Sequence, residues 1–112
     1  MAYSELLADR VRFCLQGANI SAEKKMMGGL VFMVNEKMCV GVDIDKATSQ
    51  DRLMVRVGKA SYEELLARLG SREMDFTGKV MRGFLFIGPE GFDRDEDLEF
   101  WVGKALEFNE KL

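Results

Sequence analysis

Residues 24–42, KKMMGGLVFMVNEKMCVGV, decide the fold of this chain. Short apolar runs in this stretch are separated by Gly28-Gly29 and by Asn35-Glu36. Brief apolar runs broken by turn residues are typical of consecutive antiparallel strands joined by hairpins. Asn-Glu is a weaker turn pair than Asn-Gly, because only Asn adopts a positive φ at low cost.

The segments on both sides of these hairpins have patterns of their own. Apolar residues at helical spacing predict a helix over residues 4–16, with Ser4 as N-cap and Gly17 as the stop. After the hairpins, the polar segment 43–52 predicts a loop, and the alternating segment 53–57 predicts another strand.

The second half of the chain predicts two further helices around a strand pair. Ser61 and Glu64 form a capping-box pattern before a short helix that Gly70 closes. Segments 73–76 and 80–87 predict strands around a turn at residues 77–79. An acidic turn near Asp93 begins the last helix, whose apolar stripe is Leu98, Trp101, Val102, Ala105 and Leu106. The order αβββ(β)αββα predicts one α+β domain over residues 1–112, with two layers and an antiparallel sheet of five to six strands.

Composition limits the class of protein. With 112 residues, of which 47% are apolar and 31% charged, the chain is expected to bury one core. The sequence has no apolar run near 18 residues and no signal-peptide pattern at its start, so we expect no membrane span and a cytoplasmic location. The net charge of −3 disfavours a dominant nucleic-acid binder, which is usually basic.

Histidine is absent, which excludes histidine-assisted nucleophiles, histidine bases and histidine metal ligands. Cys14 and Cys39 are far apart in sequence, so we expect two reduced thiols that behave as small apolar residues. Because no constellation of Asp, Glu, Lys, Tyr or Cys stands out, we expect no enzymatic activity, no cofactor and no metal site.

Two of the expected strands are apolar on both sides. Leu30, Phe32 and Val34 alternate with Val31 and Met33. In the later strand, Met81, Leu85 and Ile87 are expected on one face, and Arg82, Phe84 and Phe86 on the other. A sheet with one solvated face should alternate apolar with polar residues. Either a partner or ligand covers the second face, or the long last helix wraps around to cover it.

The local motifs have structural explanations. Gly28-Gly29 is followed by strand residues, so a hairpin turn is favoured over a phosphate loop. The acidic segments at Asp43 and Asp93 lack the glycine and glutamate that a calcium loop needs at set positions. Six basic residues lie in or beside strands, and they are compatible either with solvated strand edges or with an anion or nucleic-acid contact surface: Lys24, Lys25, Arg56, Lys59, Lys79 and Arg82.

The hairpin over residues 24–42 resembles the N-terminal domain of the TfoX/Sxy competence-regulator family, which has a K-M-F-G-G-x-x-F-x-x-N-G-K type of hairpin. Met81-Arg82-Gly83-Phe84 and the helix around Trp101 are also similar to that family. The sequence departs from the pattern at Met27, where an aromatic residue is usual, and at Glu36, where glycine is usual. The resemblance implies a two-layer α/β domain with an antiparallel sheet, no catalytic residues, and a regulatory role linked to bacterial DNA-uptake genes. Full-length regulators of this kind carry a second, helical domain, which is not expected after Leu112 here.

Together these features predict a non-enzymatic regulatory or protein-interaction domain that forms a homodimer or binds a protein partner through its Met- and Phe-rich sheet face. The alternative is a module for small anionic ligands or nucleic acid that uses the basic residues. The expected partner-binding or ligand-binding residues are Lys25, Arg56, Arg82, Met33, Phe84 and Phe86.

Overall fold

The computed structural model describes residues 3–26, 28–76 and 78–112 of the chain. The helices are α1 (Glu5–Cys14), α2 (Tyr62–Leu66), α3 (Pro89–Phe92) and α4 (Asp95–Asn109). The strands are β1 (Ile20–Met26), β2 (Gly29–Val34), β3 (Lys37–Asp45), β4 (Gln50–Arg56), β5 (Ser71–Phe76) and β6 (Lys79–Ile87). The expected α+β order is confirmed, and the short helix α3 is an addition to it. Met27 and Thr77, expected in an apolar run and in a turn, lie outside the described residues.

The six strands form one open antiparallel sheet in the order β1-β2-β3-β4-β6-β5. The expected loop over residues 43–52 is confirmed only for residues 46–49 and is wrong at both ends, because β3 continues to Asp45 and β4 begins at Gln50. Asp43 lies directly opposite Arg52 in the ladder, and the two side chains form an ion pair. Cross-strand pairs of opposite charge stabilise a sheet, so these polar residues extend the hairpin.

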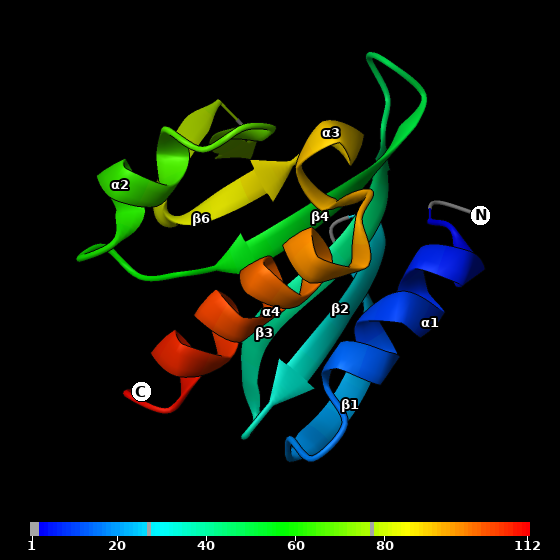
Figure 1. The fold of residues 1–112 in the computed structure, drawn as a ribbon, viewed down its shortest axis with the longest axis vertical. Coiled ribbons are helices and arrows are strands. Elements are labelled where there is room, and N and C mark those ends of the chain that lie inside the picture. The colour runs from blue at the N-terminus through cyan, green and yellow to red at the C-terminus, as the bar shows by residue number, and fades with distance from the viewer. Residues whose placement is uncertain (1–2, 27, 77) are drawn as a thin grey trace.

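The helices pack on one face of the sheet, where α1 and α4 lie side by side in Figure 1. The core on this face combines residues from every helix, such as Leu7, Leu65, Phe92 and Trp101, with alternate strand residues such as Phe32. Among the described residues, none from a helix belongs to the apolar cluster on the opposite face. The last helix therefore packs beside α1 and does not wrap around the sheet.

The helix ends follow the sequence only in part. Ser4 is the N-cap of α1, and its Oγ accepts a hydrogen bond of 3.3 Å from the Leu7 N–H. The capping box expected at Ser61 is wrong, because ψ of 2° holds this residue away from the extended conformation and its side chain makes no capping bond. The helix α4 begins at Asp95, two residues after the expected start.

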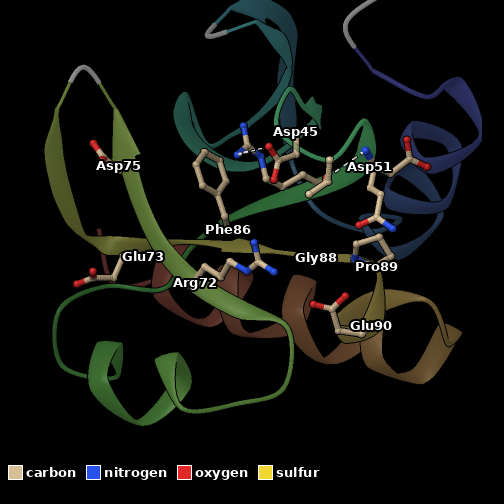
Figure 2. Close-up of a pocket in the computed structure, with 12 residues that line it drawn as sticks. Asp45, Asp51, Arg72, Glu73, Asp75, Phe86, Gly88, Pro89 and Glu90 are labelled. Carbon is tan, nitrogen blue, oxygen red and sulfur yellow. Dashed lines mark hydrogen bonds and ion pairs between the residues drawn. The ribbon is translucent and has the colours of Figure 1, made fainter.

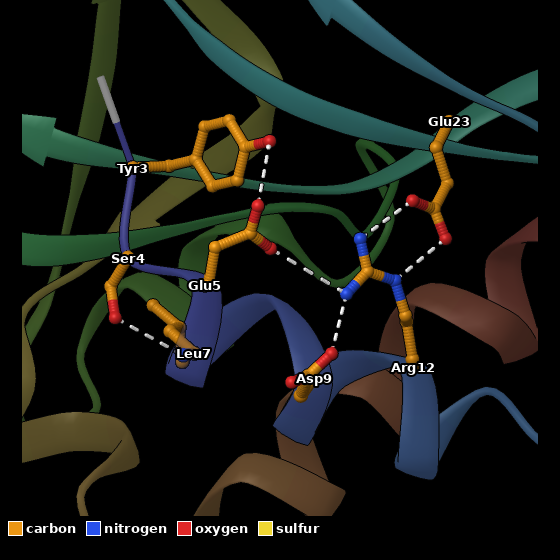
Figure 3. A network of polar contacts seen from close by, with 7 residues as sticks. All are labelled: Tyr3, Ser4, Glu5, Leu7, Asp9, Arg12 and Glu23. Atoms are coloured by element: carbon orange, nitrogen blue, oxygen red, sulfur yellow. Dashed lines mark hydrogen bonds and ion pairs between the residues drawn. The ribbon is translucent and has the colours of Figure 1, made fainter. Parts of the chain in front are cut away.

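Arg12 joins α1 to the edge strand β1 through Glu23, and it also pairs with Glu5 and Asp9 of its own helix (Figure 3). Its Nε and Nη2 each donate to a different oxygen of Glu23 at 2.8 Å, and its Nη1 donates to Asp9 at 2.5 Å. Hydrogen bonding to Arg12 lowers the pKa of Glu23. The same guanidinium lies 5.8 Å from the centroid of the Phe32 ring, so it also covers the end of the core.

Three asparagine side chains connect the end of α4 to two turns. The Asn109 Nδ2 donates 2.9 Å to the Val34 carbonyl, and its Oδ1 accepts 2.8 Å from the Asn35 Nδ2. The Asn35 Oδ1 in turn accepts 3.0 Å from Asn19. Asn109 is 4% exposed, so these hydrogen bonds satisfy a polar side chain that would otherwise be costly to bury.

The β2–β3 turn has positive φ at both central residues, 52° at Asn35 and 66° at Glu36. This is the geometry of a type I′ hairpin turn, which matches the twist of the strands but strains a residue such as Glu36. The Glu36 N–H donates 2.6 Å to the Ser21 Oγ of β1, and this hydrogen bond helps to hold the strained residue in place.

We expect Glu36→Gly to stabilise the protein by about 0.5–1 kcal/mol, because glycine adopts a positive φ without steric cost. The Ser21 hydrogen bond uses the backbone N–H and is retained in the variant. Urea unfolding measures the change, with Glu36→Ala as the control, since alanine keeps the strained Cβ and should change the stability little. A Glu36→Gly protein less stable than wild type would contradict this account of the turn.

Candidate functional site

One apolar cluster lies on the side of the sheet that carries no helix. We call this surface the helix-free face and define it by eight residues: Val31, Met33, Met38, Met54, Met74, Met81, Phe84 and Phe86. Five of the eight are methionines, whose flexible thioether side chains adapt to surfaces of different shape.

A cross-strand row runs across this face over all six strands. The ladder pairs its members in the order Lys24, Val31, Gly41, Met54, Phe86 and Arg72. Gly41 leaves a gap in the row, and a Cβ built on it would lie 3.1 Å from the Met54 Cε. The Met54 side chain therefore lies over Gly41, and this explains how Met54 is only 5% exposed with no helix above it.

The gap in the row opens into a groove of about 600 Å³. Its floor contains Val31, Gly41 and Met54, and residues of the β3–β4 hairpin also line it. Met74 of β5 and Phe86 of β6 line it as well. Met74 is 1% exposed, so the sheet residues bury part of this face by themselves and leave the groove as its open part.

Arg52 lies at the centre of the polar contacts of the groove. Its Nε and Nη2 donate to the two carboxylate oxygens of Asp43 at 3.0 and 2.7 Å, and Asp45 lies 3.9 Å away. Its guanidinium carbon is 3.6 Å from the centroid of the Phe86 ring, which is close stacking. The hydrogen bonds to Asp43 raise the pKa of Arg52, so the group stays charged.

A second, smaller hollow of about 180 Å³ adjoins the groove (Figure 2). The two share Asp45, Arg52, Asp75 and Phe86 in their linings. Figure 2 shows Phe86 and Arg72 in the middle of this hollow, with Asp45 of β3 and Glu90 of α3 on different sides of them. Glu73 of β5 points away from Arg72 in this view. The two hollows form one continuous concave surface.

The structure brings three of the expected site residues together. Met33, Phe84 and Phe86 pack against the same cluster on the helix-free face. Arg56 lies beside them at the end of β4, with its guanidinium 5.3 Å from the Phe84 ring and 5.6 Å from the Phe108 ring of α4.

Lys25 and Arg82 lie elsewhere. Lys25 pairs with Leu30, whose side chain is in the helix-covered core, so Lys25 is on the opposite side from Met33. The strands of Lys25 and Arg56 are three positions apart in the sheet, which is about 14 Å. Arg82 is exposed and near enough to Tyr62 of α2 for its charge to lower the pKa of that phenol, although burial raises the Tyr62 pKa overall.

The expected faces of the strand over residues 80–87 are wrong for its first part. Met81 packs with Phe84 and Phe86 and not with Leu85. Gly83 has a φ of 96°, and the ladder between β5 and β6 shifts register here. A left-handed residue inside a strand resets the alternation of side chains, so Met81 and Arg82 exchange faces relative to the simple pattern.

Sequence reasoning missed the charged residues Asp43, Asp45, Arg52 and Asp75 that line the groove. For Asp43 and Asp45, the signal that could have found them is their alternation with Ile44, which suits a strand as well as a loop.

The described residues offer little for covalent or metal chemistry. Burial raises the pKa of Cys39 to about 12 and also raises the pKa of the half-buried Cys14, so both thiols stay protonated near neutral pH. Within residues 3–26, 28–76 and 78–112, no group of three or more His, Cys, Asp or Glu side chains is placed to hold a metal ion. In the same part of the chain, no helix combines the length and apolar character that crossing a bilayer requires.

The structure thus defines a class of α+β domain in which four helices cover one face of an open, six-stranded antiparallel sheet. Residues 14–109 match the family model of the TfoX N-terminal domain, and the chain belongs to that family. No curated protein and no solved structure matches the chain.

We expect Arg52→Lys to lower the free energy of unfolding by about 1 kcal/mol, because an ammonium group cannot both bind Asp43 through two hydrogen bonds and stack on Phe86. Arg52→Met should cost more, about 2 kcal/mol, since it leaves the Asp43 carboxylate without its partner. Denaturant unfolding measures both variants.

Arg94→Lys is the matched control, because Arg94 pairs with Glu96 on the surface and its side chain is 74% exposed. Exposed pairs contribute little, so this variant should change the stability by less than about 0.5 kcal/mol. Equal effects at Arg52 and Arg94 would show that the Arg52 contacts contribute no more than a surface pair.

Proposed function

We propose that the chain is a non-enzymatic regulatory domain that acts by binding a protein through its helix-free face. The observation that carries the proposal is the adaptable apolar groove on a sheet face that no helix of the described residues covers. Apolar surfaces of this kind, rimmed by polar residues, are typical of protein-interaction sites. Membership of the TfoX N-terminal domain family supports a role in controlling genes for DNA uptake.

The high pKa of Cys39 argues against this thiol as a nucleophile, because a nucleophilic cysteine needs a lowered pKa. The alternative role in binding anions or nucleic acid has less support. Lys25 is separated by two intervening strands from Arg56. The groove and the smaller hollow are lined by neither of these residues nor by Arg82.

Expression of DNA-uptake genes in a bacterium that encodes this chain tests the proposal. We expect deletion of the gene to change these transcript levels and the wild-type chain to restore them. The double variant Met33→Lys/Met81→Lys should fail to restore them, because it places two charges on the helix-free face.

The matched control is Leu6→Lys/Phe13→Lys, which also replaces two apolar side chains by lysine, at two residues of α1 that are 74% and 67% exposed. Thermal unfolding followed by circular dichroism verifies that both double variants are folded. Restoration of the transcripts by the Met33→Lys/Met81→Lys variant would contradict a role of this face, and unchanged transcripts after deletion would contradict the regulatory role.

The expectation of a homodimer stays a prediction. Sedimentation velocity at micromolar concentration is expected to show a species of twice the 12.7 kDa chain mass. A single monomeric species over the whole concentration range would contradict it and would leave a different protein as the partner.

A further inference from the structure

We propose that the helix-free face binds the same face of a second copy of this chain, about a two-fold axis that runs parallel to the strands between β3 and β4. This inference rests on the proposed function, because it specifies the partner of the same surface. It is carried by the complementarity of the two halves of the face, one formed by β1, β2 and β3 and the other by β4, β6 and β5.

A two-fold axis in this position exchanges the two halves of the face. Rotation by 180° about it places β3 of one copy over β4 of the other, and β2 over β6. Positions along the strands do not change in this rotation, so residues of the same cross-strand row face each other between the copies. This arrangement is the aligned packing of two sheets that is found in β-sandwiches.

The two strands next to the axis differ in the size of their central side chains. Gly41 of β3 lies opposite Met54 of β4 in the ladder. Between the copies, each Gly41 would therefore face Met54 of the other copy, so a position without a side chain meets a long, flexible one twice. Further from the axis, Val31 would face Phe86, so apolar side chains meet apolar side chains.

The charges of these two strands are also complementary. On this face, β3 carries Asp43 and Asp45, and β4 carries Arg52 and Arg56. Asp43 lies in the same row as Arg52, so each would face the other residue of the second copy while it keeps its own partner. The Nη1 of Arg52 is 3.9 Å from Asp45, which is too far for a hydrogen bond, so it can donate to a carboxylate of the second copy.

The same rows decide the direction of the axis. An axis that crosses the strands at the central row would place each strand over itself. Gly41 would then face Gly41, and Arg52 would face Arg56, because these two arginines lie at equal distances from Met54 along β4. A void and a pair of like charges are both unfavourable, so the axis parallel to the strands fits better.

The size of the face suits a stable dimer. Six strands spaced about 4.8 Å apart, and about six residues of 3.3 Å from the row of Asp45 to the row of Arg56, give a flat area of about 24 × 20 Å. Protruding side chains make the accessible area larger than this flat area of about 480 Å². The face is therefore of the order of the 800 Å² that each partner buries in a standard interface.

One pair of positions on the face is not complementary. Lys24 of β1 and Arg72 of β5 end the central row at its two edges, and both are exposed. The rotation brings Lys24 of one copy near Arg72 of the other, so two such pairs of like charges at the rim weaken the dimer. Reversal of one of these charges should therefore strengthen it.

Sedimentation velocity on the full chain at low ionic strength measures the dissociation constant of the dimer. We expect Lys24→Glu to lower this constant roughly threefold or more, because each new carboxylate faces an Arg72. Arg72→Glu should also lower it, since its carboxylate faces Lys24. The double variant Lys24→Glu/Arg72→Glu restores like charges and should return to within about twofold of wild type.

The matched control is Lys25→Glu, which makes the same change at the neighbouring residue on the other side of β1. It should leave the dissociation constant within about twofold of wild type. The variant Met33→Lys/Met81→Lys should weaken the dimer, whereas Leu6→Lys/Phe13→Lys on α1 should not.

Cross-linking tests the orientation of the two copies. In a Cys14→Ser background, chains with Met33→Cys are mixed with chains with Phe84→Cys and treated with a short bis-maleimide. Both residues lie two positions beyond the central row, so Met33 faces Phe84 across the axis. We expect links between the two kinds of chain and few between two Met33→Cys chains, whose positions are three strand spacings, about 14 Å, apart along the sheet.

Three results would overturn the inference: a monomer at every concentration, equal effects of Lys24→Glu and Lys25→Glu, or equally strong links between two Met33→Cys chains. If one of these occurs while Met33→Lys/Met81→Lys still fails to restore the transcripts, the face binds a different partner and the proposed function stands. If that variant restores the transcripts, the proposed function itself is wrong.

Discussion

A sheet with two apolar faces and helices on only one of them is the constraint on which the rest of this structure depends. Burial of apolar area drives folding, and the helices bury the face of the sheet that contains Phe32 and Leu85. On the other face, the apolar side chains of the strands are buried only by one another. Met74 and Met54 are almost completely buried there, which shows how far side chains of neighbouring strands can cover one another.

This self-covering works because one position in the middle of the face has no side chain. Gly41 lets the Met54 side chain lie flat across the ladder, and the space beside it becomes the floor of the groove. Arg52 then fixes the β3–β4 hairpin and the Phe86 ring relative to each other, since one guanidinium both binds Asp43 and stacks on the ring. Contacts among side chains of the strands themselves therefore shape the groove.

Local patterns were sufficient to predict the elements whose signals lie within a few neighbouring residues. The hairpin of β2 and β3 followed from apolar runs and turn residues, and the α+β order followed from the change of period along the chain. The clustering of Met33, Phe84 and Phe86 followed from strands that are apolar on both sides.

Features that depend on pairing between distant residues could not be predicted in the same way. The strand ends at Asp45 and Gln50 depend on a partner across the ladder, which a run of polar residues does not reveal. The exchange of Met81 and Arg82 depends on the left-handed conformation of Gly83, and many glycines in strands do not adopt it. The groove itself depends on the register that places Gly41 between Val31 and Met54.

The asparagine connection at the end of α4 has a consequence for how this domain can be joined to other polypeptides. Since Asn109 binds both the Val34 carbonyl and Asn35, a mechanical load applied to the last residues would reach the β2–β3 turn before it could unwind α4. The carboxyl end is in this sense anchored to the middle of the chain. A flexible tether that begins after Leu112 would leave this anchor intact, whereas a rigid helical fusion continuing directly from α4 would pull on it.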